Sequence, residues 1–202
     1  MNYSIKLLSF SLFFFSVCVN AQEMNNSSLF NVSLRSGIST YEVENQFKSV
    51  AVNYSAHLLK EFKISDQGAL NLGLGVNNFH FDFVDSNGLF INAQNTFLEL
   101  PIGYKRYTYN ENRTNAFVTE LGILNRLKLN EDFTTFPETD FKEDLGYHLA
   151  YMVGLGYQTT INDKIGFAVG FIYSSDLLDS RYDNSNRIEN QVSIYFDFKF
   201  FN

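Results

Sequence analysis

Three histidines are the first candidates for chemistry, because imidazole is the side chain that most often moves protons near neutral pH. They are His57, His80 and His148. Asp82 follows His80 by two residues, and with Ser86 or Ser175 as nucleophile these groups could form a His–Asp–Ser hydrolase acting on lipid. Neither serine stands in a recognisable nucleophile motif. We therefore expect that the protein is not an enzyme and that its histidines fill polar space.

Acidic side chains gather in the segment Asn130–Asp144, beside the single lysine Lys142. They are Glu131, Asp132, Glu138, Asp140, Glu143 and Asp144. Such a cluster could contact a divalent cation or a basic partner, but the calcium-loop spacing with its central glycine is absent. The segment Asp179–Glu189 has the composition of a polar loop without a phosphate-binding glycine motif. We therefore expect neither a metal site nor a bound cofactor.

The charge balance of the whole chain excludes another class of partner. Its 202 residues include 22 acidic and 15 basic side chains, which gives a formal net charge of −7. A chain with this balance offers no basic surface to nucleic acid, so no nucleic-acid partner is expected. Phe and Tyr are abundant, with 22 and 12 residues, and this aromatic richness favours β-strands.

Residues 1–21 have the composition of a signal peptide that is cleaved on export. Lys6 provides the positive charge, an apolar stretch follows it, and small residues end the segment. That stretch is shorter than the roughly 20 apolar residues that a membrane-spanning helix needs. The single cysteine, Cys18, lies in this segment. The mature chain, residues 22–202, is therefore expected to form one domain without disulfides or thiolate metal ligands.

Eight segments of the mature chain alternate apolar residues with small or polar ones, which is the period of a β-strand. They span residues 30–35, 50–58, 70–83, 98–105, 117–123, 146–157, 165–173 and 192–200. Most of them approach the 9–11 residues of a tilted membrane-crossing strand. In the third segment the apolar phase changes at Asn77-Asn78. A change of phase by one residue predicts a β-bulge there.

The connections between these segments alternate in length. The short ones span residues 63–67, 110–114 and 161–164, and the long ones span 84–95, 130–144 and 175–190. Short turns at one end and long polar loops at the other are typical of outer-membrane barrels. The chain is therefore predicted to be all-β, an eight-stranded antiparallel up-and-down transmembrane β-barrel. An even number of strands returns both chain ends to the periplasmic side, where the short turns lie.

The face opposite the apolar residues indicates which side of the strands points inward. In three of the eight segments this face is largely Gly and Ala, which suits a narrow eight-stranded interior better than a solvated surface. Charges placed in mid-strand on this face can pair across the lumen. A polar network in the lumen is predicted from Arg35, Glu99, Lys105, Glu120, His148, Asp197 and Lys199. His80 is predicted on the same inward face, toward the long-loop end.

Aromatic residues cluster near the ends of several segments. Those in 79–83, 104–109 and 196–201 are predicted to form girdles at the two membrane interfaces. A soluble lipocalin-like carrier would also show alternation, but with its apolar face inward, and it stays open as an alternative.

One segment carries a family resemblance. The sequence TFLELPIGYK at Thr96–Lys105 resembles a strand of the small outer-membrane β-barrel proteins of the porin family in Gram-negative bacteria. The runs Gly154–Tyr157 and Gly166-Phe167 are similar, and the aromatics that end at Phe200-Phe201 resemble the C-terminal signal read by the outer-membrane assembly machinery. The resemblance implies a location in the cell outer membrane, with outer-membrane lipid and that machinery as partners.

Together these patterns predict a structural or interaction protein that is anchored in the outer membrane and displays acidic loops outside the cell. A narrow pore for small solutes is a second alternative, although eight strands leave an interior filled with side chains rather than a wide channel. An extracellular or periplasmic ligand is expected, of a chemistry that the sequence leaves open.

Overall fold

The computed structural model describes residues 29–43, 47–84, 88, 90–135, 146–178 and 187–201. These residues form one closed barrel, in which every strand is antiparallel to its neighbours and β1 pairs with β8. The strands are β1 (Leu29–Val43), β2 (Phe47–Lys63), β3 (Gly68–Val84), β4 (Phe90–Tyr109), β5 (Asn115–Thr135), β6 (Tyr147–Asn162), β7 (Ile165–Leu178) and β8 (Arg187–Phe200). The predicted eight-stranded antiparallel fold is confirmed. Within the described ranges, no helix is long and apolar enough to cross a membrane.

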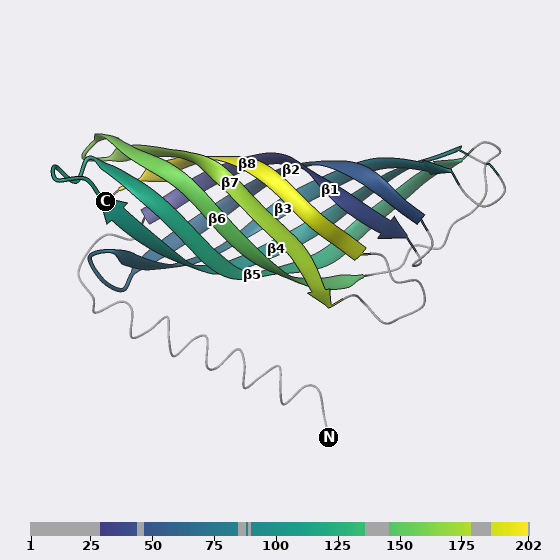
Figure 1. Ribbon diagram of the computed structural model, residues 1–202, viewed down its shortest axis with the longest axis horizontal. Coiled ribbons are helices and arrows are strands. Elements are labelled where there is room, and N and C mark those ends of the chain that lie inside the picture. Colours follow the sequence, from purple (N-terminus) through teal and green to yellow (C-terminus); the bar gives the residue numbers. More distant parts are fainter. Residues whose placement is uncertain are drawn as a thin grey trace, which may run out of the picture.

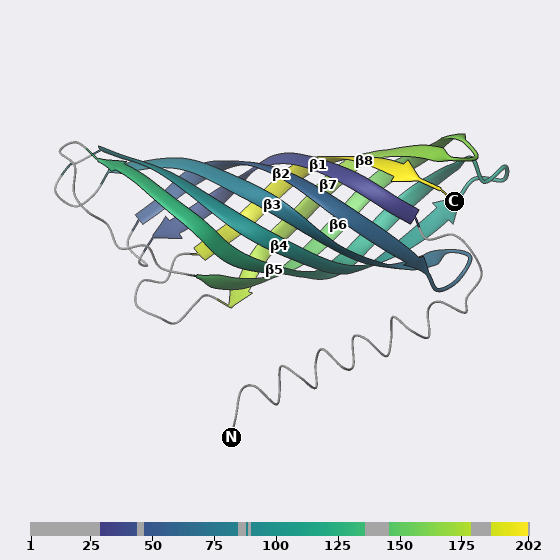
Figure 2. The same ribbon diagram turned by 180° about the vertical axis from the view of Figure 1, so that it is seen from behind.

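The three short connections lie together at one end of the barrel, which we call the turn end (Figures 1 and 2). Asparagine side chains close two of these turns. The Asn110 side-chain oxygen accepts the amide of Asn115 at 3.0 Å. That of Asn162 accepts two successive amides at 2.9 Å each. Such side-chain bonds satisfy backbone donors where the ladder ends, which makes tight turns stable.

At the opposite end, which we call the loop end, the strands run further than the alternation predicts. β4 begins at Phe90, β5 continues to Thr135 and β7 to Leu178. The predicted long loops at 84–95, 130–144 and 175–190 are therefore partly strand. Residues 136–145 and 179–186, with most of the acidic segment, lie outside the described residues, as does the predicted signal peptide at 1–21.

The two faces of the wall differ sharply in exposure, because successive strand residues point to opposite sides. Large apolar side chains point outward from all eight strands, and their alternate neighbours are buried inside. Glycines let neighbouring strands and lumen side chains approach closely. A Cβ atom at Gly170 would lie 2.2 Å from the Leu155 carbonyl oxygen and 2.6 Å from the Gly156 Cα atom. Packing against β6 therefore requires glycine at position 170.

The predicted bulge at Asn77-Asn78 is wrong. The β2–β3 register runs without a shift from Ala51↔Phe81 to Lys63↔Ala69, so the inward parity of β3 never changes. What changes is the chemistry of the two faces. Below this level the apolar residues, such as Val76, point outward, and above it Phe79 and Phe81 point inward.

The inward aromatics meet at the loop end in a cluster that we call the aromatic cap. It consists of Tyr41, Ala51, Phe79, Phe81, Ala93, Phe97 and Ile188. Tyr41 and Phe81 stack with their ring centroids 4.1 Å apart, and Phe79 meets Phe97 edge to face at 5.5 Å. The prediction that residues 79–83 form an outer girdle is therefore wrong for Phe79 and Phe81. Phe196, Phe198 and Phe200 of β8 do point outward.

Candidate functional site

The lumen below the aromatic cap is filled with charged and polar side chains. All seven residues of the predicted lumen network lie there, each less than 8% exposed. They are Arg35, Glu99, Lys105, Glu120, His148, Asp197 and Lys199. The structure divides them between two ion clusters at different heights, except for Arg35, which donates to the Ser33 hydroxyl at 3.3 Å.

The lower ion cluster, nearer the turn end, is centred on Glu61. Its carboxylate lies 2.8 Å from Lys105 Nζ and 3.2 Å from Lys199 Nζ. The Tyr107 hydroxyl donates to the same carboxylate, and Asn31 Nδ2 donates to it at 2.6 Å. A fully buried carboxylate is stable only when its charge and lone pairs are satisfied in this way.

Two more carboxylates complete the lower ion cluster. Lys105 Nζ lies 3.4 Å from Asp197 and 3.9 Å from Glu120. Asn71 donates to Glu120 at 2.9 Å. β2, β4, β5 and β8 contribute the charged groups, so the cluster ties together strands that are not neighbours in the wall.

The upper ion cluster is centred on Arg126, whose side chain is fully buried. Its Nε atom donates to Glu99 at 2.9 Å and its Nη1 atom to Asp176 at 2.9 Å. Its Nη2 atom donates to Ser174 Oγ at 3.1 Å and to the side-chain oxygen of Gln191. The guanidinium is thus held by partners on β4, β7 and β8, and it lies 5.8 Å from the Phe79 ring centroid just below the aromatic cap.

Each carboxylate of the upper ion cluster also contacts a histidine. His57 Nε2 lies 2.7 Å from Glu99, and His148 Nδ1 lies 2.8 Å from Asp176. The Asp176 carboxylate also accepts the backbone amide of Ile188 at 2.8 Å. These contacts form a continuous hydrogen-bonded row across the lumen, in the order His57, Glu99, Arg126, Asp176 and His148.

The buried charges of the lumen nearly cancel. Among the described residues, six carboxylates and five Lys or Arg side chains are buried, which nearly balances the lumen. Within the same ranges, no group of three or more His, Cys, Asp or Glu side chains could hold a metal ion. Every ion-cluster group named above is already engaged with protein partners.

Among the described residues, the structure separates His80 and Asp82 from His148 and Ser175, which the hydrolase hypothesis would combine. His80 and Asp82 are exposed on the outer surface of β3, although His80 was predicted to face inward. His148 is buried in the lumen, and Ser175 is buried too. The barrel wall therefore separates the two histidines. Ser86 lies outside the described residues.

Sequence reasoning missed the centres of both clusters. Glu61 continues the inward parity of His57 and Leu59, three residues beyond the predicted end of its segment. Arg126 and Asp176 lie similarly beyond the predicted ends of theirs. Extending the period of two through these polar residues would have found all three.

This geometry defines the class of protein, which is a closed eight-stranded β-barrel with a charged interior and an apolar exterior. No protein-family model and no curated protein matches the chain. Among solved structures it is similar to the outer membrane protein OprG from Pseudomonas aeruginosa, with a TM-score of 0.63 and 12% identity over 88% of this chain and 96% of that one.

Neisserial surface protein A is another similar structure, with a TM-score of 0.49 and 10% identity over 87% of this chain and 97% of that one. At such low identity, the similarity to OprG concerns the fold.

Proposed function

We propose that this chain is an outer-membrane β-barrel protein of the porin-family type, with a structural or interaction role and no catalytic activity. Its partners are outer-membrane lipid, the assembly machinery that inserts it, and a ligand at one of its two ends. No nucleic acid is among them. The observation that carries the proposal is the apolar outer surface of the barrel.

Large apolar side chains on this surface are far more exposed than a water-soluble protein tolerates. Val50 is 68% exposed, Leu121 63% and Phe171 59%, and comparable residues lie on every strand. Soluble monomers rarely expose a contiguous apolar patch of more than a few hundred Å². A surface of this kind around the whole barrel is suited to lipid, in which apolar side chains carry no hydration cost. The soluble-carrier alternative requires the opposite arrangement.

The exchange of apolar and polar residues between the two faces of β3 supports a membrane boundary. Directly above Val76 the outward side chains of β3 are Asn78, His80 and Asp82, before Val84 ends the strand, and the facing residues of β4 include Asn92. Asn92 donates to Asp82 at 2.6 Å on this outer surface. Directly above Val76 these strands thus have a polar exterior and an aromatic interior, as expected for a wall that emerges from lipid into water.

The packed lumen favours an anchor over a conduit. The aromatic cap and both ion clusters fill successive levels with buried side chains. A narrow pore for small solutes remains the second candidate, and it is tested by the conductance of the refolded protein in a planar bilayer. Discrete channel openings would support the pore, and a silent bilayer would support the anchor.

Orientation and location can be tested together by cysteine labelling, because the only native cysteine is Cys18 in the predicted signal. Asp140→Cys places a thiol in the acidic segment, and Glu111→Cys places one in the turn between β4 and β5. On intact cells, a membrane-impermeant maleimide should label the first variant, and it should label the second only after the outer membrane is permeabilised. The reverse pattern, or recovery of the protein in the detergent-free soluble fraction, contradicts the proposal.

A further inference from the structure

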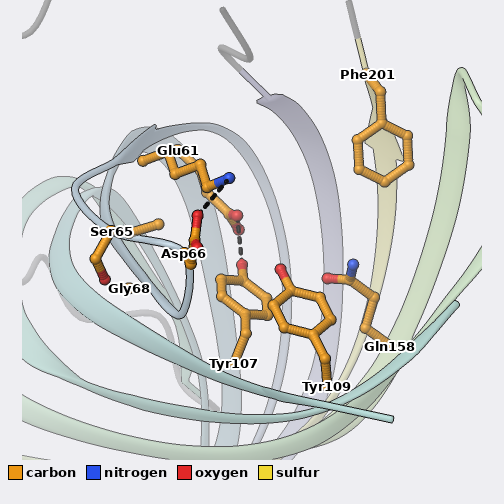
Figure 3. A pocket seen from close by; sticks show the side chains of 10 residues that line it. Glu61, Ser65, Asp66, Gly68, Tyr107, Tyr109, Gln158 and Phe201 are labelled. Atoms are coloured by element: carbon orange, nitrogen blue, oxygen red, sulfur yellow. Dashed lines mark hydrogen bonds and ion pairs between the residues drawn. The ribbon is translucent and has the colours of Figure 1, made fainter. Parts of the chain in front are cut away.

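A cavity of about 140 Å³ opens at the turn end of the barrel, between the ends of β2, β3, β4, β6 and β8 (Figure 3). It lies on the turn-end side of the lower ion cluster, and Glu61 and Tyr107 of that cluster form part of its lining. A cavity of roughly 150 Å³ accommodates a benzene ring in other proteins, so this one can hold a small organic group. Nothing in the proposed membrane role uses it.

One side of the cavity is aromatic. The rings of Tyr107 and Tyr109 stack with their centroids 5.8 Å apart and an interplanar angle of 20°. Phe201 lines the cavity from the end of β8, where its backbone amide donates to the Lys164 carbonyl at 2.8 Å. Aromatic faces attract the alkyl stem of a ligand and, through their quadrupole, a cationic group.

An unsatisfied acceptor also lines the cavity. Gln158 of β6 is only 5% exposed, and its side-chain oxygen has no hydrogen-bond partner. Figure 3 shows its amide beside the Tyr109 ring. A buried carbonyl oxygen that has lost water and gained no donor is costly. The oxygen therefore calls for a ligand that donates a hydrogen bond.

A buried carboxylate, that of Glu61, lines the cavity and can attract a cation. The lower ion cluster joins three carboxylates, those of Glu61, Glu120 and Asp197, with the two ammonium groups of Lys105 and Lys199. The buried guanidinium of Arg35, which donates to Ser33 opposite Asp197 in the β1–β8 ladder, supplies a third positive charge, so these buried charges balance. At the rim, exposed Asp66 lies 3.7 Å from Lys63, so this pair adds no net charge.

From these observations we propose that the cavity binds an organic ammonium or guanidinium group on a short apolar stem. The charged head donates to the Gln158 oxygen in the cavity that the Glu61 carboxylate also lines, and the stem packs between Tyr109 and Phe201. A free small amine and the Lys or Arg side chain of a protein partner at the turn end share this chemistry.

The test is a titration of the full mature chain, refolded in detergent micelles, with butylammonium chloride and with N-acetyl-lysine methylamide. Binding is followed by calorimetry and by tyrosine fluorescence, and sodium butyrate serves as the anionic counterpart of the same size. We expect both cations to bind and butyrate not to bind. Stronger binding of the lysine derivative would identify a protein side chain as the source, and stronger binding of butylammonium a free amine.

Two substitutions should move the affinity in opposite directions. Gln158→Leu removes the acceptor and should weaken butylammonium binding roughly tenfold, the worth of one hydrogen bond to a charged group. Gln158→Glu keeps an acceptor and adds a negative charge, so it should strengthen binding. Gln94→Leu, on the outer face at the loop end, is the matched control and should bind as the wild type does.

Heat-modifiable migration on gels verifies that each variant is folded. Butyrate binding as tight as butylammonium binding would overturn the proposal. So would a folded Gln158→Leu barrel that keeps the wild-type affinity, or a Gln158→Glu barrel that binds more weakly than the wild type. None of these outcomes bears on the membrane location, which the cysteine labelling tests separately.

Discussion

The substitution Arg126→Met removes the charge at the centre of the upper ion cluster while keeping most of the volume of the side chain. The guanidinium donates to Glu99 and Asp176 at 2.9 Å each and to two further side-chain oxygens. All of these bonds are lost together. Glu99 keeps His57 and Asp176 keeps His148, so each carboxylate loses its permanent positive partner but retains a neighbour.

The expected cost follows from the burial of these groups. The side chains of Arg126 and Asp176 are completely buried, and that of Glu99 is 1% exposed. Removing one partner of a buried ion pair destabilises a protein by about 3–5 kcal/mol, because a charge is left without compensation. We expect about 4 kcal/mol here, since the histidines soften the loss for both carboxylates. With a urea dependence of about 2 kcal/mol per M, the unfolding midpoint should fall by about 2 M.

The assay is urea unfolding and refolding of the mature chain in lipid vesicles, followed by circular dichroism and by heat-modifiable migration. Arg106→Met is the matched control, because Arg106 points outward from β4 near the turn end and should cost little. In the double variant Arg126→Met/Glu99→Gln one of the two stranded carboxylates becomes neutral, so part of the lost stability should return. A midpoint for Arg126→Met equal to that of Arg106→Met would refute the reasoning, as would a double variant less stable than Arg126→Met alone.

Three further substitutions test the wall, its outer face and the aromatic cap. Gly170→Ala should lower the free energy of unfolding in urea by about 1–3 kcal/mol, because its Cβ would meet backbone atoms of β6. Gly154→Ala, with its nearest contact at 3.2 Å, should cost less. Equal losses for the two variants would contradict the close-approach argument. Leu121→Arg should destabilise the barrel in vesicles by about 2–4 kcal/mol, and an unchanged vesicle midpoint would argue against a lipid-facing position. Phe97→Ala should cost about 3–5 kcal/mol in the same assay, because Phe97 is fully buried. Phe117→Ala is the control, because Phe117 points outward. A larger effect at Phe117 than at Phe97 would contradict the assigned faces.

The closed barrel itself was within reach of the sequence. A period of two carried through eight segments, with glycine on one face and large apolar residues on the other, is compatible with few folds other than a narrow barrel. Short connections such as 110–114 also set neighbouring strands antiparallel. These signals are local. They can be read from a single sequence because the residues of each strand must suit the lumen on one face and the outer surface on the other.

The loop end was less predictable, because the rule for the two faces changes along the strand. Within the apolar band the large side chain points outward, as Val76 does, and above it the large side chain points inward, as Phe79 does. In the sequence alone, this exchange looks the same as the insertion of one residue. Only the continuous β2–β3 register distinguishes a change of surroundings from a bulge.

The sequence predicted only some members of the ion clusters, and it predicted none of their pairings. Glu61, Arg126 and Asp176 each follow a polar residue that interrupts the outward apolar alternation, so a search for apolar runs stops before them. Pairing across the lumen depends on the stagger of the strands around the barrel, which no local pattern records. Lys199 and Glu61, for example, are 138 residues apart in the chain and 3.2 Å apart in space.

That stagger suggests what the buried charges contribute. The apolar alternation on the outer face determines only which residues of a strand point outward, because a slip of one residue would turn every apolar side chain inward. A slip of two residues keeps all of them outside and is not opposed by the lipid-facing surface. In the β4–β5 ladder, Glu99 is directly opposite Arg126 and Lys105 is opposite Glu120. A two-residue slip that places Glu99 opposite Leu124 would place Lys105 opposite Val118, and both buried pairs would be broken. Because each broken pair leaves an uncompensated charge, we infer that the ion clusters select this register among those that the apolar pattern permits equally.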